Sequence, residues 1–401
     1  MLAFEIQEGG VRGEMAFDAL GPFSRRAGRA VTRRGRNAAG RVRLARQQLA
    51  TYAPRSSVQS VEHHVARPAV PAIDAHNHLG RWLLGGRGWM TPDVIRLRDQ
   101  LDELGIDAMV NLDGRWGEEL EANLQRYDRA HPGRFVTFCH VEWDALASDA
   151  RAPRRWLAQL EQSAAAGAAG IKVWKDLGLV VRDAAGRLVL PDDPRLADVW
   201  AAAGELGLPV LIHVADPPAF FAPPDRHNER LEEMLLHPEW IWHGKSVPSH
   251  GRLLEALESV LSAHRGTRFI AAHVANSPDD LGAVSRLLDE NPNLAVDLAA
   301  REPELARQPR ASRAFLERHA DRVLWGTDVF PLDPDRVRIW YRILETEDEY
   351  FPYSPDAVPP QGRWSVYGLG LPAEVLTRLY STNARSWIPA LASVRAPSRT
   401  R

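Results

Sequence analysis

Residues 70–80 read VPAIDAHNHLG, a short apolar run that ends in two histidines. Side chains alternate between the two faces of a strand, so His76 and His78 are expected to project from the same face. Two imidazoles on one face can bind the same cation. The segment therefore predicts a strand that brings two metal ligands to its carboxyl end.

Seven more short apolar runs follow, separated by stretches with helical periodicity, and this alternation is typical of a parallel sheet wound with helices. The runs are DAMVNL (107–112), RFVTFCHV (134–141), GIKVW (170–174), PVLIHV (209–214), RFIAAHV (268–274), NLAVDLA (293–299) and RVLWGTD (322–328). Helices are expected between them at 92–104, 154–166, 195–206, 251–264 and 278–290. Eight strands in strict βα order, with no glycine-rich phosphate loop after the first, favour a closed (β/α)₈ TIM barrel over an open doubly wound sheet.

The barrel pattern does not cover the whole chain. Residues 20–60 are rich in arginine and contain no acidic residue, as expected of a solvated extension with some helix near 41–52. A transit peptide and a nucleic-acid arm are the alternatives for this segment. The expected organisation is a poorly ordered, basic N-terminal extension at 1–67, a metal-dependent barrel at 68–391 and a C-terminal tail at 392–401. Two insertions, at about 216–248 and 350–367, are aromatic and long enough to serve as lids over a site.

Composition excludes several functional classes. The chain of 401 residues is 45% hydrophobic and 25% charged with a formal net charge of −2, so nucleic acid and membrane surfaces are not expected as partners. No apolar run is long enough to cross a bilayer and no signal-peptide pattern opens the chain, which predicts a cytoplasmic protein. The single cysteine, Cys139, excludes an intrachain disulfide and a thiolate metal cage. Its neighbour His140 suggests a Cys/His nucleophile, but a buried thiol is the commoner state.

Polar residues recur where the predicted strands end. In a (β/α)₈ barrel the carboxyl ends of all strands meet at one rim, where groups from distant positions converge. We expect this rim to collect His76, His78, Lys172, His213, His273, Asp297, Arg301 and Asp328. Imidazoles together with a carboxylate suit Zn²⁺ and leave a coordination position for water or substrate.

Several of these segments resemble the amidohydrolase superfamily, namely VPAIDAHNHLG, GIKVWKDLGL, PVLIHVADP, FIAAHVAN and LWGTDVFP. The most similar branch is the amidohydrolase-related group that includes the aminocarboxymuconate-semialdehyde decarboxylases, and the resemblance covers about residues 70–390. It implies that His76, His78, His213 and Asp328 bind the metal. It also implies that His273 is the catalytic histidine beside the metal-bound water.

Lys172 allows two interpretations. Only three of the 50 basic residues are lysines, and two of them fall in GIKVWK at 170–175, which suggests that an amine is needed there unless both are incidental. In binuclear members of the superfamily a carboxylated lysine at a similar position bridges two metals, whereas the mononuclear branch lacks this bridge. We favour one divalent metal, Zn²⁺ with Mn²⁺ as the alternative. Lys172 would then be a cation for a substrate carboxylate or for developing negative charge.

The predicted function is a metal-dependent hydrolase that activates water to cleave a C–N or C–O bond of a small amide, lactone or ester. Asp328, or His273 through the water, would take the proton and return it to the leaving group. Arg301 would hold a substrate carboxylate, with a structural salt bridge as the alternative, and Trp174 would contact a flat or apolar substrate. A metal-dependent non-oxidative decarboxylase uses the same ligands and stays open, whereas a non-catalytic barrel would be expected to have lost some of them. The expected partner is a small-molecule substrate, and a homodimer is left open.

Overall fold

The computed structural model describes residues 38, 40–149, 151–356 and 358–392. The chain divides into two compact units, Met1–Ser57 and Val58–Arg401. In the first unit, residues 40–46 are helical and a 3₁₀ turn covers Leu49–Thr51. Most of the predicted N-terminal extension, and the predicted tail beyond residue 392, lie outside the described residues.

All eight predicted strands are present in the second unit, and every pair formed among them is parallel. Their bounds are β1 Ala72–Asn77, β2 Ile106–Asn111, β3 Phe135–Thr137, β4 Ile171–Val173, β5 Val210–Ile212, β6 Phe269–Ala271, β7 Leu294–Asp297 and β8 Val323–Leu324. Several strands are shorter than the apolar runs suggested, because the chain bends at their carboxyl ends. Residues predicted as the last part of a strand, such as His273 and Asp328, instead lie in the turns that form the rim.

The strands close into a ring. Hydrogen bonding gives the orders β1-β2-β3 and β4-β5-β6-β7-β8. An isolated parallel bridge between Cys139 and Ile171 joins the first group to the second. On the other side, the Ala75 amide donates to the Trp325 carbonyl at 3.1 Å, and the Asp328 amide donates to the His76 carbonyl at 2.8 Å. The ring is therefore continuous, and the chain is a (β/α)₈ barrel as predicted.

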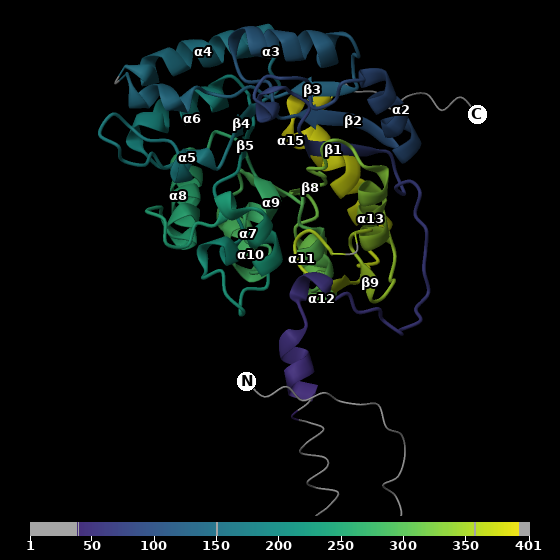
Figure 1. The fold of residues 1–401 in the computed structure, drawn as a ribbon. Helices are drawn as coiled ribbons and strands as arrows, with labels where there is room; N and C mark the ends of the chain where they lie inside the picture. Colours follow the sequence, from purple (N-terminus) through teal and green to yellow (C-terminus); the bar gives the residue numbers. More distant parts are fainter. Residues whose placement is uncertain (1–37, 39, 150, 357, 393–401) are drawn as a thin grey trace, which may run out of the picture. The chain divides into compact units, whose positions relative to one another are not determined.

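Amphipathic helices cover the outside of the barrel, and Figure 1 shows α3 and α4 side by side there. Asp93, Ser249 and Asp280 cap α2, α8 and α10 through their side chains, as expected of residues that accept from free amides at a helix start. The longer helices are α2 Val94–Leu104, α3 Gly117–Leu124, α4 Ala152–Ala166, α6 Ala197–Glu205, α8 His250–Ala263, α10 Leu281–Glu290, α12 Pro309–Arg318 and α13 Pro334–Glu345. The shorter ones are α5 Asp176–Leu179, α7 Leu231–Leu236, α9 Ala272–Ala275, α11 Glu302–Ala306, α14 Ala373–Thr377 and α15 Asn383–Trp387.

Strand residues alternate between two apolar cores. In β2, Ala108 and Val110 belong to the cluster inside the barrel, whereas Met109 packs in the layer between strands and helices. Both faces of each strand are buried, which explains why the strands read as continuous apolar runs. The inner cluster also contains Ala384 and Leu391, from α15 and the 3₁₀ turn Pro389–Leu391. The C-terminal segment therefore completes the packing of the barrel interior.

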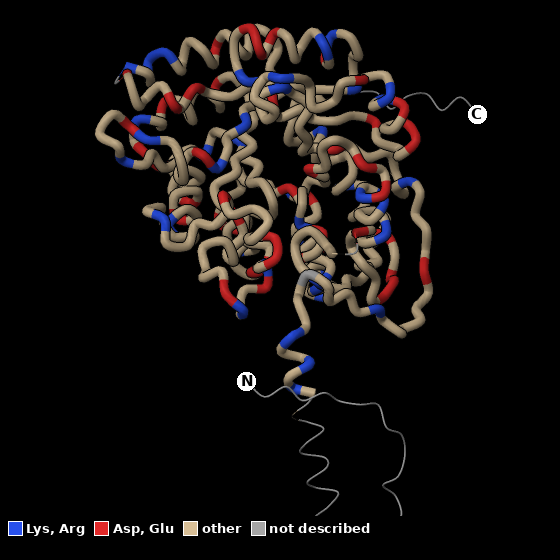
Figure 2. Tube along the Cα trace, in the orientation of Figure 1, with Lys and Arg blue, Asp and Glu red and all other residues tan. Residues whose placement is uncertain are grey.

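The described residues of both insertions include regular elements. The first contains the 3₁₀ turns Pro218–Phe221 and Pro238–Trp240 on either side of α7, and the second contains the antiparallel pair β9 Phe351–Pro352 and β10 Ser365–Val366. In the barrel unit, Figure 2 shows basic and acidic residues interspersed over the helices. Among the described residues, no helix combines the length and the apolar character needed to span a bilayer.

Candidate metal centre

His76 in β1 and His78, directly after the strand, are both held through Nδ1 by buried carboxylates. His76 Nδ1 lies 2.8 Å from Asp297 Oδ2, and His78 Nδ1 lies 2.9 Å from Asp113 Oδ1. A carboxylate on Nδ1 fixes the proton there and leaves Nε2 free for a cation. Burial lowers the pKa of His78, but Asp113 and Asp328 outweigh it and raise that pKa to about 9. Asp297 was predicted at the rim, and its structural role is to orient His76.

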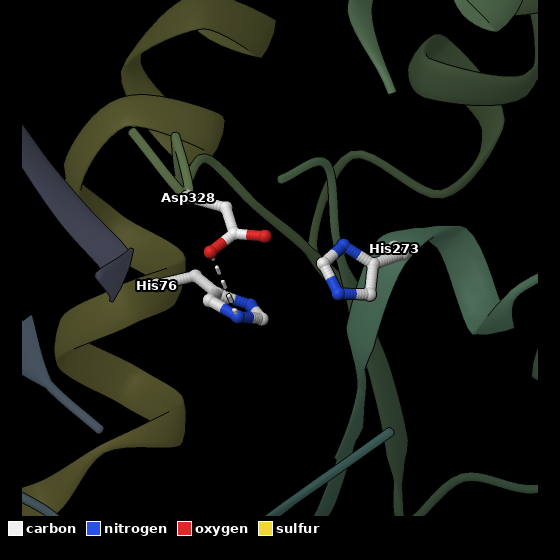
Figure 3. Close-up of side chains that lie close together, drawn as sticks. All are labelled: His76, His273 and Asp328. Carbon is white, nitrogen blue, oxygen red and sulfur yellow. Dashed lines mark ion pairs between the residues drawn. The ribbon is translucent and has the colours of Figure 1, made fainter. Parts of the chain in front are cut away.

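His273 and Asp328 complete a compact group with His76 (Figure 3). One possible ligand atom from each lies within 4.8 Å of the others. Both residues have left-handed backbone conformations, with φ of 58° at His273 and 57° at Asp328. Such conformations are unfavourable for residues other than glycine and occur often at functional sites. The His273 ring is fixed by Nδ1 at 2.7 Å from the Ala299 carbonyl oxygen, which leaves its Nε2 unprotonated.

Asp328 supplies the atom that best fits a missing cation. Its Oδ1 is buried and has no hydrogen-bond partner among the described residues, although it lies 3.3 Å from His78 Nε2 and 3.9 Å from His76 Nε2. Burial opposes ionisation of Asp328, but the surrounding histidines hold its pKa far below the usual range. A carboxylate oxygen that faces two imidazole nitrogens is the donor set of a Zn²⁺ or Mn²⁺ site. The residues present therefore fit a divalent metal.

His213 lies beside this group with the opposite ring orientation. Its Nε2 is 2.9 Å from the Ala215 carbonyl oxygen, so Nδ1 is the nitrogen left for a ligand. The centre of its ring lies 4.5 Å from the ring centre of His273. The structure thus lines one cavity with the five rim residues His76, His78, His213, His273 and Asp328, but the compact group contains His273 and neither His78 nor His213. Which of these two imidazoles is the metal ligand stays a prediction.

Lys172 lines the same cavity as the candidate metal ligands. It is fully buried, with Nζ 3.4 Å from His76 Nε2 and 5.0 Å from the centre of the Trp174 ring. Burial lowers the pKa of Lys172 to about 8, so a substantial fraction of the amine is neutral near that pH. A contact with substrate and a carboxylated lysine that bridges two metals both require Lys172 to lie beside the metal ligands. The geometry is compatible with a substrate contact and with a carboxylated lysine.

These residues line one cavity of about 400 Å³, a size within the range of small-molecule sites. Trp174, Phe220, Trp240 and Phe330 form its aromatic walls, and Leu83 adds an aliphatic side chain. Other rim tryptophans serve elsewhere. Trp143 packs against Trp156 and Trp200 in the helix layer, and Trp82 donates to Asp113 Oδ1 at 3.0 Å.

Arg301 lines the same cavity and also forms a salt bridge, so the two alternatives considered for it are compatible. Its Nη1 donates to Glu304 Oε1 at 3.1 Å, and burial lowers its pKa. A second arginine that sequence reasoning missed, Arg230, is 2% exposed and bonds to the same Glu304 oxygen. It lies in the first insertion, where only the unusual length of the loop signalled a functional segment.

Asp74 and Asp113 are two further residues that the sequence did not single out. Asp74 accepts from the Thr327 amide at 2.9 Å and from the Thr327 hydroxyl at 2.6 Å, which ties β1 to the turn after β8. The position of Asp113 just after β2 was the one available signal for it, whereas Asp74 lies within β1. Cys139, by contrast, is not a nucleophile of this site, because burial raises its pKa to about 12.

Comparison with known proteins agrees with this geometry. A family model described as amidohydrolase matches residues 73–389. The chain belongs to the amidohydrolase family. Family members are enzymes that depend on a divalent metal, in accord with the donor set at the barrel rim. No curated protein sequence shows significant similarity to the chain.

Solved structures share the amidohydrolase fold at low sequence identity. The 2,6-dihydroxybenzoate decarboxylase from Rhizobium is 14% identical, with a TM-score of 0.53 over 80% of this chain and 99% of that one. A dihydroxybenzoic acid decarboxylase from Polaromonas, with bound manganese and 2-nitroresorcinol, is 15% identical, with a TM-score of 0.50 over 80% and 97%. An uncharacterized TIM-barrel protein from Bordetella bronchiseptica is also 15% identical, with a TM-score of 0.51 over 80% and 99%. At this level the likeness establishes the fold alone.

Proposed function

We propose that this protein is a metal-dependent hydrolase that cleaves a C–N or C–O bond of a small amide, lactone or ester. One divalent cation, Zn²⁺ or alternatively Mn²⁺, would be held by His76, His78, His213 and Asp328. The observation that carries the proposal is the position of Asp328 Oδ1, which has no hydrogen-bond partner among the described residues and faces the imidazoles of His76 and His78, within a chain of the amidohydrolase family. When bound, the cation supplies Lewis acidity and lowers the pKa of water.

Proton transfer would fall to Asp328 and His273. Asp328 is ionised, as a proton acceptor must be, and would take the proton of the attacking water and return it to the leaving atom. His273 carries its proton on Nδ1, which leaves Nε2 available as a base in the same cavity. Lys172 in its ammonium form would stabilise negative charge that develops on the substrate oxygen. Trp174 would pack on an apolar or flat part of the substrate.

A carboxy-lyase is the second candidate, and one observation favours it. The cavity combines aromatic walls with four cationic side chains, Lys172, Lys175, Arg230 and Arg301, which suits an aromatic acid. His273 or Asp328 would first take up a proton from solvent and then transfer it to the ring carbon as the bond to the carboxylate breaks and CO₂ leaves. The decarboxylases with the same fold act on dihydroxybenzoates, as their names state.

The deciding experiment incubates zinc-loaded and manganese-loaded protein with lactones, amides, esters and aromatic acids. A pH-stat would follow acid release, and trapped CO₂ would be measured separately. We expect acid release without CO₂, and CO₂ from aromatic acids would instead establish the carboxy-lyase. The Asp328→Asn variant should be inactive in either case, whereas a surface control, His264→Ala, should behave as wild type. Activity that survives in Asp328→Asn would contradict both candidates.

A further inference from the structure

The cavity borders a second polar cluster that the proton-transfer steps above do not use. Arg230 and Glu233 from the first insertion and Arg301 from the segment after β7 line the cavity, and the fully buried Glu304 joins the two arginines without lining it. Arg230 Nη1 donates to Glu233 Oε2 at 2.7 Å, and both arginines donate to Glu304 Oε1. Two guanidinium groups that line a small-molecule cavity therefore share one buried carboxylate oxygen.

We infer that Arg230 and Arg301 form a subsite for a carboxylate group of the substrate, and that Arg230 determines specificity for it. This inference rests on the proposed function, because it concerns the substrate of the same site. Arg301 still has hydrogen-bonding capacity, since its buried Nε has no partner among the described residues. Arginine has five donors in a planar fork, and carboxylates are the ligands that match this geometry.

The position of the pair relates the carboxylate to the reacting group. Arg301 lines the same cavity as His273, and it shares Glu304 with Arg230. Both arginines thus line the cavity that the candidate metal ligands also line. Arg230 also lies 5.8 Å from the centre of the Phe220 ring, a wall of the cavity. A substrate that contacts both the metal centre and the arginines carries a carboxylate on a flat apolar unit, with its reacting group on another position of that unit.

Both insertions hold Arg230 in place. Gln361, from the second insertion, accepts from Arg230 Nη2 at 3.3 Å and donates to the Ala300 carbonyl oxygen at 3.3 Å. Beside it, Arg363 and Glu232 form a two-bond ion pair at 2.5 and 2.8 Å between the same insertions. A guanidinium fixed from several sides loses little conformational freedom when a ligand binds, so it discriminates ligands well.

The test compares 3-carbamoylbenzoate, which has one carboxylate, with isophthalamide, in which a second neutral amide replaces it. Binding to the zinc-loaded protein would be measured by isothermal titration calorimetry, and benzoate against benzamide would serve as a smaller pair. We expect the wild type to bind the carboxylate of each pair at least tenfold more tightly than the corresponding amide. Arg230→Met and Arg301→Met should each weaken carboxylate binding by roughly 10- to 150-fold, the range of a charge-assisted hydrogen bond, and leave amide binding within about threefold.

Arg230→Met leaves two buried acids with one fewer partner, which endangers folding. The double variant Arg230→Met/Glu233→Gln removes the pair as a unit and should show the same loss of preference. Arg318→Met, whose arginine pairs with Asp289 on the helix layer, is the matched control and should bind as wild type. The subsite is overturned if the wild type does not prefer the carboxylate in either ligand pair. It is also overturned if the double variant keeps the wild-type preference for the carboxylate. Preference without any turnover would overturn the proposed reaction and leave the subsite intact.

Discussion

Three of the four imidazoles at the metal centre are fixed through Nδ1. Asp297 fixes His76, Asp113 fixes His78, and the Ala299 carbonyl oxygen fixes His273. His213 is the exception, since its Nε2 is the nitrogen bonded to backbone. Hydrogen bonds of this kind orient metal-binding histidines and set their tautomers. The orientation of each ring is therefore fixed by its neighbours before any ligand arrives.

The metal centre leads to a first prediction. Purified protein should retain close to one Zn²⁺ or similar ion per chain, and His76→Ala/His78→Ala should abolish it, because both Nε2 atoms face Asp328 Oδ1. Elemental analysis by mass spectrometry measures the content. His264→Ala, outside the cavity, should keep the wild-type value. Full metal content in the double variant would rule out this site.

Lys172 allows a prediction that separates one metal from two. If Lys172 contacts substrate, Lys172→Ala should keep its single metal and lose roughly 10²–10³ in rate, the effect of removing an electrostatic donor at a transition state. We expect this outcome. If Lys172 is instead carboxylated, the variant should fall from two metals to one or fewer, and short carboxylic acids should partly restore them. Metal analysis and steady-state kinetics on one preparation distinguish the two results.

The sequence predicted the histidines of the site better than the groups around them. The period of a strand places His76 and His78 on one face, and the rim rule collects His213, His273 and Asp328. Asp113 and Arg230 were not predicted, because no local sequence pattern distinguishes a functional aspartate after a strand or a functional arginine in a long loop. Their roles depend on contacts with residues far along the chain, such as the one 35 positions away between Asp113 and His78.

At the scale of elements, the sequence predicted each strand but not where it ends. Apolar side chains continue past the last ladder hydrogen bond, as in β6, where the strand stops at Ala271 and residues 273–276 all have positive φ. Hydrophobicity marks burial, and the rim turns are as buried as the strands. Only the backbone geometry distinguishes the rim turns from the strands. That geometry follows from closure of the barrel and from tertiary contacts, such as the hydrogen bond from the His273 amide to Asp297 Oδ1.

The link between α3 and β3 leads to a prediction about pH. Asp128 lies in the π-helical turn Gln125–Arg129 that continues α3, and its carboxylate accepts from the Thr137 amide at 2.9 Å and from the Thr137 hydroxyl at 2.6 Å. Burial raises the pKa of Asp128 from 3.8 to about 7. The folded state therefore keeps a proton that the unfolded state releases between these values. The contribution to stability is complete below pH 4 and is lost as the pH rises to 7.

Asp128→Asn does not titrate, so the stability of wild type relative to this variant should fall over that range, by on the order of 2–4 kcal/mol. Urea unfolding between pH 4 and 8 measures the difference in the free energy of unfolding between the two proteins. The contributions of the other titrating groups are common to both and cancel in this difference. A difference that stays constant or increases with pH would show that Asp128 is ionised when folded.

For the whole molecule, the division after Ser57 predicts which part of the chain suffices for function. The unit Val58–Arg401 contains all eight strands and every residue of the cavity. Deleting residues 1–57 should leave the melting temperature and the metal content unchanged. Extending the deletion to residue 67, the boundary expected from sequence, also removes His63, whose Nδ1 lies 2.5 Å from Asp348 Oδ1. That longer deletion should lower the melting temperature, and a loss of metal already in the shorter one would contradict the division.

The closure between β1 and β8 also has a consequence for synthesis. Asn77 Nδ2 donates to Thr327 Oγ1 across 250 positions of sequence. At a typical elongation rate this separation corresponds to roughly 12–50 s on the ribosome. During that interval the nascent β1 has no neighbour on its β8 side, and an unpaired strand edge is prone to aggregation. The inner packing of the barrel is completed later still, when Ala384 and Leu391 leave the exit tunnel. Cellular yield should therefore depend on how well this open edge is shielded while translation finishes.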